Sequence, residues 1–292
     1  AAAELSRELI PDPAGNQKLR RHLALLGLEM ETAVYRDEYG RLRAELKGEG
    51  CQTLDTPEEL AALSDLLGVP TRAEAGEESL TLIQLEPLMA VAGVAARKKD
   101  GETVSGDAGT YFKREDGTLY VLLCDGMGTG EPAAGLSADC VHLLGDLLRA
   151  GVAPLDALRI LNGTYLLRGD GCFSTVDLLH IDLTSGEAEL LKWGAAPSYL
   201  RCGDTVKKLG TASLPPGVGV GGDHAPERYR LSLRGGEMLV LVSDGAGDAE
   251  SAVAGFAGDS PRELAALLIA GLPAEDDMTA VAVALAPRAS RD

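Results

Sequence analysis

An apolar run that ends in an acidic, glycine-rich turn decides the fold: Leu119-Tyr120-Val121-Leu122-Leu123-Cys124-Asp125-Gly126-Met127-Gly128-Thr129-Gly130. A short continuous apolar run bounded by glycines is typical of a strand buried on both faces. Two more aspartates adjoin apolar runs of the same kind, Asp244 after residues 238–242 and Asp277 before residues 278–285. A fourth, Asp107, follows Ser105-Gly106. We therefore expect the four aspartates at the ends of strands, where the backbone holds their side chains.

Carboxylates gathered at one edge of a sheet repel one another, and the sequence has no matching basic cluster beside them. Hard divalent cations remove that repulsion, and oxygen-only ligands favour Mg²⁺ or Mn²⁺ over zinc. A flanking glycine such as Gly126 lets a backbone carbonyl approach an ion. Two such ions about 3.5–4 Å apart can activate water for attack at phosphorus. Each Asp-Gly pair alone is more often a turn, but four in one chain favour a metal site.

Other known glycine-rich binding motifs match the turn at residues 125–130 only in part. Gly128, Gly130 and Ala133 match G-x-G-x-x-A, but a dinucleotide site needs an acidic residue at the end of the next strand, about 20 residues on. Asp146 has that spacing and lies in a helical pattern instead. A P-loop lacks its Gly-Lys-Ser/Thr, and a calcium loop would need glutamate where Leu136 stands.

Composition excludes several partners. The net charge of −18 over 292 residues argues against nucleic acid and against electrostatic docking on an anionic membrane. Five cysteines without CxxC spacing predict reduced thiols in the cytoplasm. We expect neither a signal peptide nor a membrane span in this sequence, since no apolar run reaches about 20 residues. Because the chain begins at Ala1 without methionine, we expect a cytoplasmic piece of a longer protein, whose membrane segments would lie outside this chain.

The patterns divide the chain into two parts. Residues 1–78 predict a helix-strand-strand-helix segment, with one helix at Leu19, Leu23 and Leu26 and another capped by Thr56-Pro57-Glu58-Glu59. The polar residues 74–79 predict a linker. Residues 79–292 are rich in strand patterns, interrupted by helical patterns over 132–149 and 154–167.

The order of the motifs resembles the metal-dependent serine/threonine protein phosphatases, the PPM family, and within it the phosphatases of sporulation. The motifs are SGD, DGMGTG, FSTVDLLHIDL, WGAAPSYL, LPPG, LVSDG and DDMT, which begin at Ser105, Asp125, Phe173, Trp193, Leu214, Leu241 and Asp276. The resemblance covers residues 88–286. It implies an α+β fold, an αββα layered β-sandwich over residues 79–292, preceded by a small α/β regulatory segment over residues 1–78.

The resemblance also implies a role for each aspartate. Asp125 would bridge two Mn²⁺ or Mg²⁺ ions, the Gly126 carbonyl would bind one of them, and Asp107 would support that ion through water. Asp244 and Asp277 would bind the other ion, so that Asp125, Asp244 and Asp277 form the catalytic set. Helices 132–149 and 154–167 would match the family's switch helices, although packing of the core explains them equally well.

The implied substrate is phosphoserine on a small anti-anti-sigma factor, in the control of a sporulation sigma factor. The front segment could join two copies into a homo-oligomer. The alternative is a non-catalytic scaffold, in which a phosphatase fold binds a regulatory protein.

Overall fold

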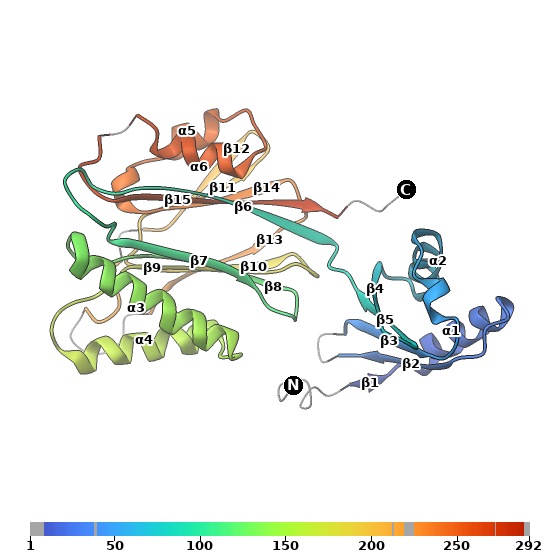
Figure 1. Ribbon diagram of the computed structural model, residues 1–292. Coiled ribbons are helices and arrows are strands. Elements are labelled where there is room, and N and C mark those ends of the chain that lie inside the picture. Colours follow the sequence, from blue (N-terminus) through green and yellow to red (C-terminus); the bar gives the residue numbers. More distant parts are fainter. Residues whose placement is uncertain (1–8, 38–39, 212, 219–224, 272, 289–292) are drawn as a thin grey trace. The chain divides into compact units, whose positions relative to one another are not determined.

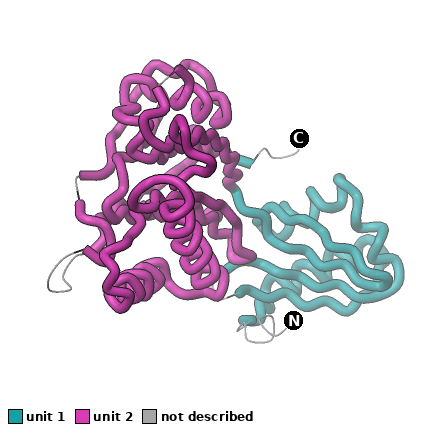
Figure 2. Tube along the Cα trace, turned by 60° about the vertical axis from the view of Figure 1, so that its left-hand side comes forward, with its two compact units in different colours: residues 1–87, 288–292 teal, residues 88–287 magenta. Residues whose placement is uncertain are grey.

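The computed structural model describes residues 9–37, 40–211, 213–218, 225–271 and 273–288. The chain forms two compact units, residues 1–87 with 288–292 and residues 88–287, called unit 1 and unit 2 (Figure 2). Among the described residues, no helix has the length and apolar character needed to cross a membrane.

Unit 1 is a five-stranded antiparallel sheet with two helices packed on it. The strand order is β1-β2-β3-β5-β4. Leu42, Ala44 and Leu46 alternate with exposed or half-buried polar residues along β3, and they pack with Leu19 and Leu63 of the helices. The elements are β1 (Ile10–Pro11), α1 (Pro13–Leu25), β2 (Glu31–Arg36), β3 (Leu42–Lys47), the 3₁₀ turn η2 (Cys51–Leu54), α2 (Pro57–Leu67), β4 (Thr71–Ala75) and β5 (Ser79–Gln84).

The stretch expected to be a linker, residues 74–79, is instead the end of one strand and the turn of a hairpin. The Gly76 amide donates to the Ser79 carbonyl at 2.7 Å, and β4 pairs with β5 on either side of this turn. The strand after the turn pairs within unit 1, because Leu80 and Leu82 fill that unit's core. The structural division therefore falls at Pro87, nine residues after the boundary drawn from the sequence at residue 78.

Unit 2 has four layers (Figure 1), and the predicted αββα sandwich is confirmed. One antiparallel sheet has the order β13-β10-β9-β8-β7 and the other β12-β11-β14-β15-β6. The strands are β6 (Leu88–Arg97), β7 (Asp107–Lys113), β8 (Thr118–Asp125), β9 (Val176–Asp182), β10 (Glu187–Trp193), β11 (Ser198–Cys202), β12 (Thr205–Leu209), β13 (Glu227–Ser232), β14 (Glu237–Val242) and β15 (Met278–Pro287).

Helices cover the outer faces of the two sheets. The predicted helices 132–149 and 154–167 are present as α3 (Gly130–Arg149) and α4 (Pro154–Arg168), which pack on the first sheet. The second sheet is covered by α5 (Glu250–Gly255) and α6 (Pro261–Ile269), and the 3₁₀ turn η3 (Asp244–Ala246) follows β14.

Alternation along the central strands determines which side chains enter the layer between the sheets. On β8, Leu119, Val121 and Leu123 face the other sheet, whereas Tyr120, Leu122 and Cys124 pack under the helices. Asp125 continues the inward-facing series, because side chains on a strand alternate with period two. On β15, Val281 and Val283 face inward, so Thr279 and Asp277 share their parity. The two sheets thus deliver carboxylates to the same end of their shared layer.

A prediction concerns the contact between α6 and β6. A Cβ at Gly93 would lie 2.2 Å from the Arg262 nitrogen, so a methyl group there must push the start of the helix away. We expect Gly93→Ala to lower the free energy of unfolding by about 3 kcal/mol, measured by urea denaturation. The matched control is Gly135→Ala, at an exposed position in α3 where the added Cβ has no atom of another segment within 4 Å. It should stabilise by about 0.5–1 kcal/mol, and equal effects at both positions would contradict the packing argument.

Candidate metal centre

The first sheet contributes two carboxylates that face each other across a strand pair. Asp107 at the start of β7 is directly opposite Asp125 at the end of β8. The backbone of Asp125 is fixed from the other side, since its carbonyl accepts hydrogen bonds from the Thr175 amide and the Ser174 hydroxyl, both at 2.8 Å. The Asp125 amide donates to the Thr175 hydroxyl at 3.3 Å. The position of Asp125 is therefore set by both neighbouring strands.

The second sheet contributes Asp277 and Asp244. The Asp277 carboxylate accepts hydrogen bonds from two backbone amides, those of Lys99 at 2.9 Å and Gly106 at 2.7 Å. The Gly106 carbonyl in turn accepts from the Gly126 amide at 3.1 Å. Short backbone contacts thus connect the ends of the two sheets, from Asp277 through Gly106 to Gly126.

Glycine is required at two of these positions because other backbone passes close by. A Cβ on Gly126 would lie 2.0 Å from the Ala133 carbonyl oxygen in the first turn of α3. A Cβ on Gly245 would lie 2.2 Å from the Asp277 carbonyl oxygen. Neither contact can be relieved by turning a side chain, since the atoms belong to the backbone. The Asp-Gly pairs therefore allow close packing of the segments that hold the aspartates.

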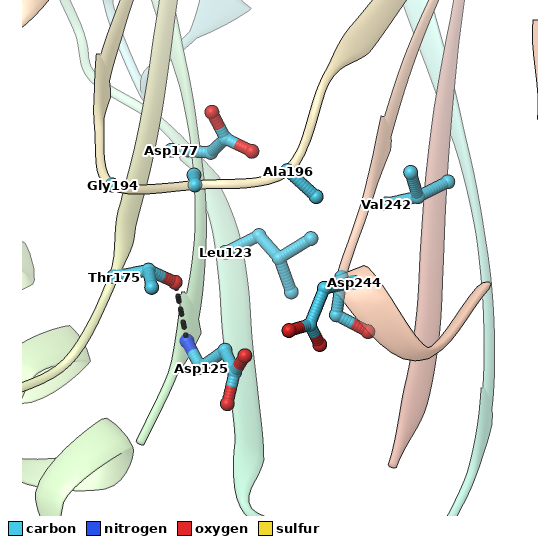
Figure 3. Close-up of a pocket in the computed structure, with 10 residues that line it drawn as sticks. Leu123, Asp125, Thr175, Asp177, Gly194, Ala196, Val242 and Asp244 are labelled. Atoms are coloured by element: carbon cyan, nitrogen blue, oxygen red, sulfur yellow. Dashed lines mark hydrogen bonds between the residues drawn. The ribbon is translucent and has the colours of Figure 1, made fainter. Parts of the chain in front are cut away.

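Asp125 and Asp244 line one small cavity between the sheets (Figure 3). Its volume is about 30 Å³, enough for about two water-sized groups. Thr175 and Asp177 from β9 and its preceding turn also line it, together with the small residues Gly194 and Ala196. The cavity is thus bounded by both sheets, and its polar wall is mainly acidic.

The aspartates shift one another's protonation. Burial, followed by the charges of Asp107, Asp244, Asp276 and Asp277, raises the pKa of Asp125 to about 8. Burial raises the pKa of Asp107 to about 6, and the nearby hydroxyls of Ser243 and Thr279 oppose that rise. Both carboxylate oxygens of Asp107 are buried and have no hydrogen-bond partner among the described residues. The carboxyl groups therefore cannot all be ionised near neutral pH without a positive partner that the site's own groups do not supply.

These residues are compatible with a pair of hard divalent cations. All the donors are oxygens, and unpartnered buried carboxylate oxygens are what an Mg²⁺-like ion would satisfy. Within the described part of the chain, no three His, Cys, Asp or Glu side chains converge closely enough to form a ligand group by themselves. An ion here would take the rest of its shell from backbone oxygen and water, as Mg²⁺ usually does.

The structure brings the sequence-predicted residues together, and their individual roles as ligands remain predictions. Sequence reasoning missed Asp177, which lies one strand away from Asp125 and is 1% exposed. A signal was present in the alternation: Asp177 shares its parity with Leu179 and Ile181, so it had to point into the apolar layer. The nucleotide interpretation is not supported, because the sheets are antiparallel and Asp146 lies exposed within α3.

A sandwich of two antiparallel sheets between helical layers, with aspartates from both sheets at one end, is the fold of the PP2C-type phosphatases, the PPM class. The family model described as stage II sporulation protein E matches residues 115–291. The chain belongs to the stage II sporulation protein E family, and the resemblance to the sporulation phosphatases is confirmed.

Relatives and solved structures agree with this assignment. Stage II sporulation protein E of Priestia megaterium is 31% identical over 212 residues, which are 66% of this chain and 36% of that protein. The chain therefore spans about a third of that relative. A structure of the PP2C phosphatase domain and a fragment of the regulatory domain of SpoIIE from Bacillus subtilis is 25% identical, with a TM-score of 0.71, over 95% of this chain and 88% of that chain. RsbX in complex with magnesium shares the fold at 18% identity, with a TM-score of 0.54, over 74% of this chain and all of that one.

The raised pKa of Asp125 gives a prediction about stability. Its ordinary value is 3.8 and its value in the fold is about 8, so protonated Asp125 favours folding below pH 4, and this contribution is lost as the pH rises through 8. At pH 8 in EDTA, Asp125→Asn should therefore raise the free energy of unfolding by about 1–3 kcal/mol, allowing for solvent screening. At pH 5 the gain should be smaller.

Thermal unfolding at the two pH values measures this effect. The control is Asp146→Asn, which makes the same charge change on a side chain that is 82% exposed. Its melting temperature should match that of the parent chain. An Asp125→Asn variant less stable than the parent in EDTA at pH 8 would show that the carboxylate is not under electrostatic strain.

Proposed function

We propose that this chain is a metal-dependent phosphatase that hydrolyses phosphoserine on a protein. The observation that carries the proposal is that Asp125 and Asp244, from facing sheets, line one cavity, while Asp277 is tied to the same sheet end by backbone amides. The raised pKa of Asp125 supports it, because strongly shifted carboxyl groups are typical of functional sites. A bound cation would favour the ionised carboxylate, which burial and the neighbouring acids disfavour. Membership of the family supports the same reaction class.

The proposed roles follow the sequence-based assignment. Asp125 would hold both ions, the Gly126 carbonyl and Asp107 one of them, and Asp244 and Asp277 the other. When bound, Mn²⁺ or Mg²⁺ would supply a water activated at neutral pH and charge stabilisation for phosphoryl oxygens. The magnesium complex of RsbX, which has this fold, supports the choice of ion.

The chain's own contribution would be to hold the aspartates in place and to line one side of the cavity with apolar residues. Asp277 cannot rotate freely, because each of its oxygens accepts a backbone hydrogen bond. The Ser243 hydroxyl accepts from the Thr279 amide at 2.8 Å, which locks the segment before Asp244 to the start of β15. Leu123 and Val242 form the apolar side of the cavity, and charges beside an apolar wall interact more strongly than they do in water.

The substrate we propose is a phosphorylated anti-anti-sigma factor, and the biological role is the control of a sporulation sigma factor. The support is the resemblance of the motifs and the match to the sporulation family. Because the chain spans 36% of the Priestia megaterium relative, this substrate and role are proposals for the whole protein.

We propose further that unit 1 is part of a regulatory region. The support is the solved SpoIIE structure that pairs a phosphatase domain with a fragment of a regulatory domain and matches 95% of this chain. If so, residues 88–287 alone should need a different Mn²⁺ concentration for half-maximal phosphate release than the whole chain does. Identical Mn²⁺ dependence in the two proteins would contradict a regulatory effect.

The central test is release of phosphate from a phosphoserine-containing anti-anti-sigma factor. We expect release with Mn²⁺ or Mg²⁺ and none in excess EDTA. Asp125→Asn should reduce the turnover number by more than about 100-fold, beyond the effect typical of a residue that only supports a ligand. Asp146→Asn should leave it unchanged. Activity that persists in EDTA would refute the metal mechanism, and tight substrate binding without turnover by the parent chain would favour the non-catalytic scaffold.

A further inference from the structure

A buried lysine–aspartate pair lies in the apolar layer between the sheets of unit 2. Lys192 on β10 is directly opposite Asp177 on β9, and the two side chains are 0% and 1% exposed. The Lys192 ammonium donates to Asp177 Oδ1 and, at 2.8 Å, to the Ser198 hydroxyl. Both residues share the inward face with the apolar side chains of the sandwich core, such as Leu190.

Packing alone does not account for this pair. A buried ion pair seldom stabilises a fold more than apolar side chains of the same volume would. In addition, Asp177 Oδ2 is buried and has no hydrogen-bond partner among the described residues. A buried polar atom without a partner is unfavourable. The unpaired Asp177 Oδ2 therefore indicates a hydrogen-bond donor that the described residues do not supply. Asp177 lines the same cavity as Asp125 and Asp244.

The strand register places Asp177 at a definite distance from the candidate metal ligands. Asp177 is directly opposite Leu123 on β8, and Asp125 follows two residues later on the same face. Diagonal neighbours of this kind have Cβ atoms about 7 Å apart. At that spacing a water molecule can join one carboxylate to the shell of an ion held by the other.

We propose that Asp177 is a positioning residue of the cation site, and that its Oδ2 accepts a hydrogen bond from water in the shell of a divalent cation. Lys192, itself bonded to Ser198, holds Oδ1, so that Oδ2 is the oxygen left without a partner among the described residues. The Lys192 charge balances that of Asp177, which adds an acceptor to the acidic cluster without adding net charge. This inference rests on the proposed function, because it assumes that the aspartates bind cations.

The test measures Mn²⁺ binding by the whole chain through isothermal titration calorimetry with MnCl₂ alone. We expect Asp177→Asn to raise the apparent dissociation constant by about 10-fold or more, the usual effect of removing a partner that orients a metal's ligands. The matched control is Asp116→Asn, a half-buried, ion-paired aspartate (its side chain is 9% exposed and 3.0 Å from Arg114) in the turn before β8. Its dissociation constant should equal that of the parent chain.

A second variant guards against misfolding, since Asp177→Asn leaves Lys192 buried without a counter-ion. Asp177→Leu combined with Lys192→Met replaces the pair by apolar side chains, which should preserve the fold by circular dichroism and weaken Mn²⁺ binding as the single change does. Parental affinity in this folded double variant would overturn the inference. Parental affinity in Asp125→Asn as well would overturn the proposed cation site, whereas loss in Asp125→Asn alone would leave that site standing and remove only the role of Asp177.

Discussion

Repulsion among carboxylates held at one end of two facing sheets is the constraint on which this structure depends. Asp125 takes the largest effect, with a pKa raised to about 8, because burial and four neighbouring acids act on it together. The aspartate side chains are not free to rotate away from one another and so reduce this repulsion. Backbone amides hold Asp277, and strand pairing fixes Asp107 opposite Asp125. Stability of the metal-free fold and readiness for a cation are therefore opposed at the same few residues.

Sequence patterns were sufficient for the parts of the fold that depend on single strands or helices. The apolar run before Asp125 and the capped helix at Thr56 both appear as expected, because local alternation and capping act within a few residues. The hairpin at residues 74–79 was misread as a linker, since polar turn residues and polar linker residues have the same composition. Which of the two forms depends on Leu80 and Leu82 reaching a core built from distant segments.

The sequence was sufficient to predict the aspartates of the candidate site, but not the residues that surround them. Each aspartate adjoined a strand pattern, so its place at a sheet end could be inferred from the sequence. The pairing of Asp177 with Lys192 spans fifteen residues and depends on the β9–β10 register, which no local pattern sets. The contact that requires glycine at position 126 also involves a distant segment, the first turn of α3. Sequence reasoning had explained this glycine only by the approach of its carbonyl to an ion, which stays a prediction.

Strand β6 has a mechanical consequence for the site. It begins at Leu88, where unit 1 ends in the chain, and pairs residue by residue with β15 as far as Arg97 opposite Met278. Two residues later, the Lys99 amide holds the Asp277 carboxylate. Because side chains alternate, a slip of one residue would turn the whole inward face of β6 outward. A displacement of β6 along its axis would therefore have to move the whole strand, about 30 Å long, as one unit. Such a movement would reach the Asp277 carboxylate through the Lys99 amide at its far end.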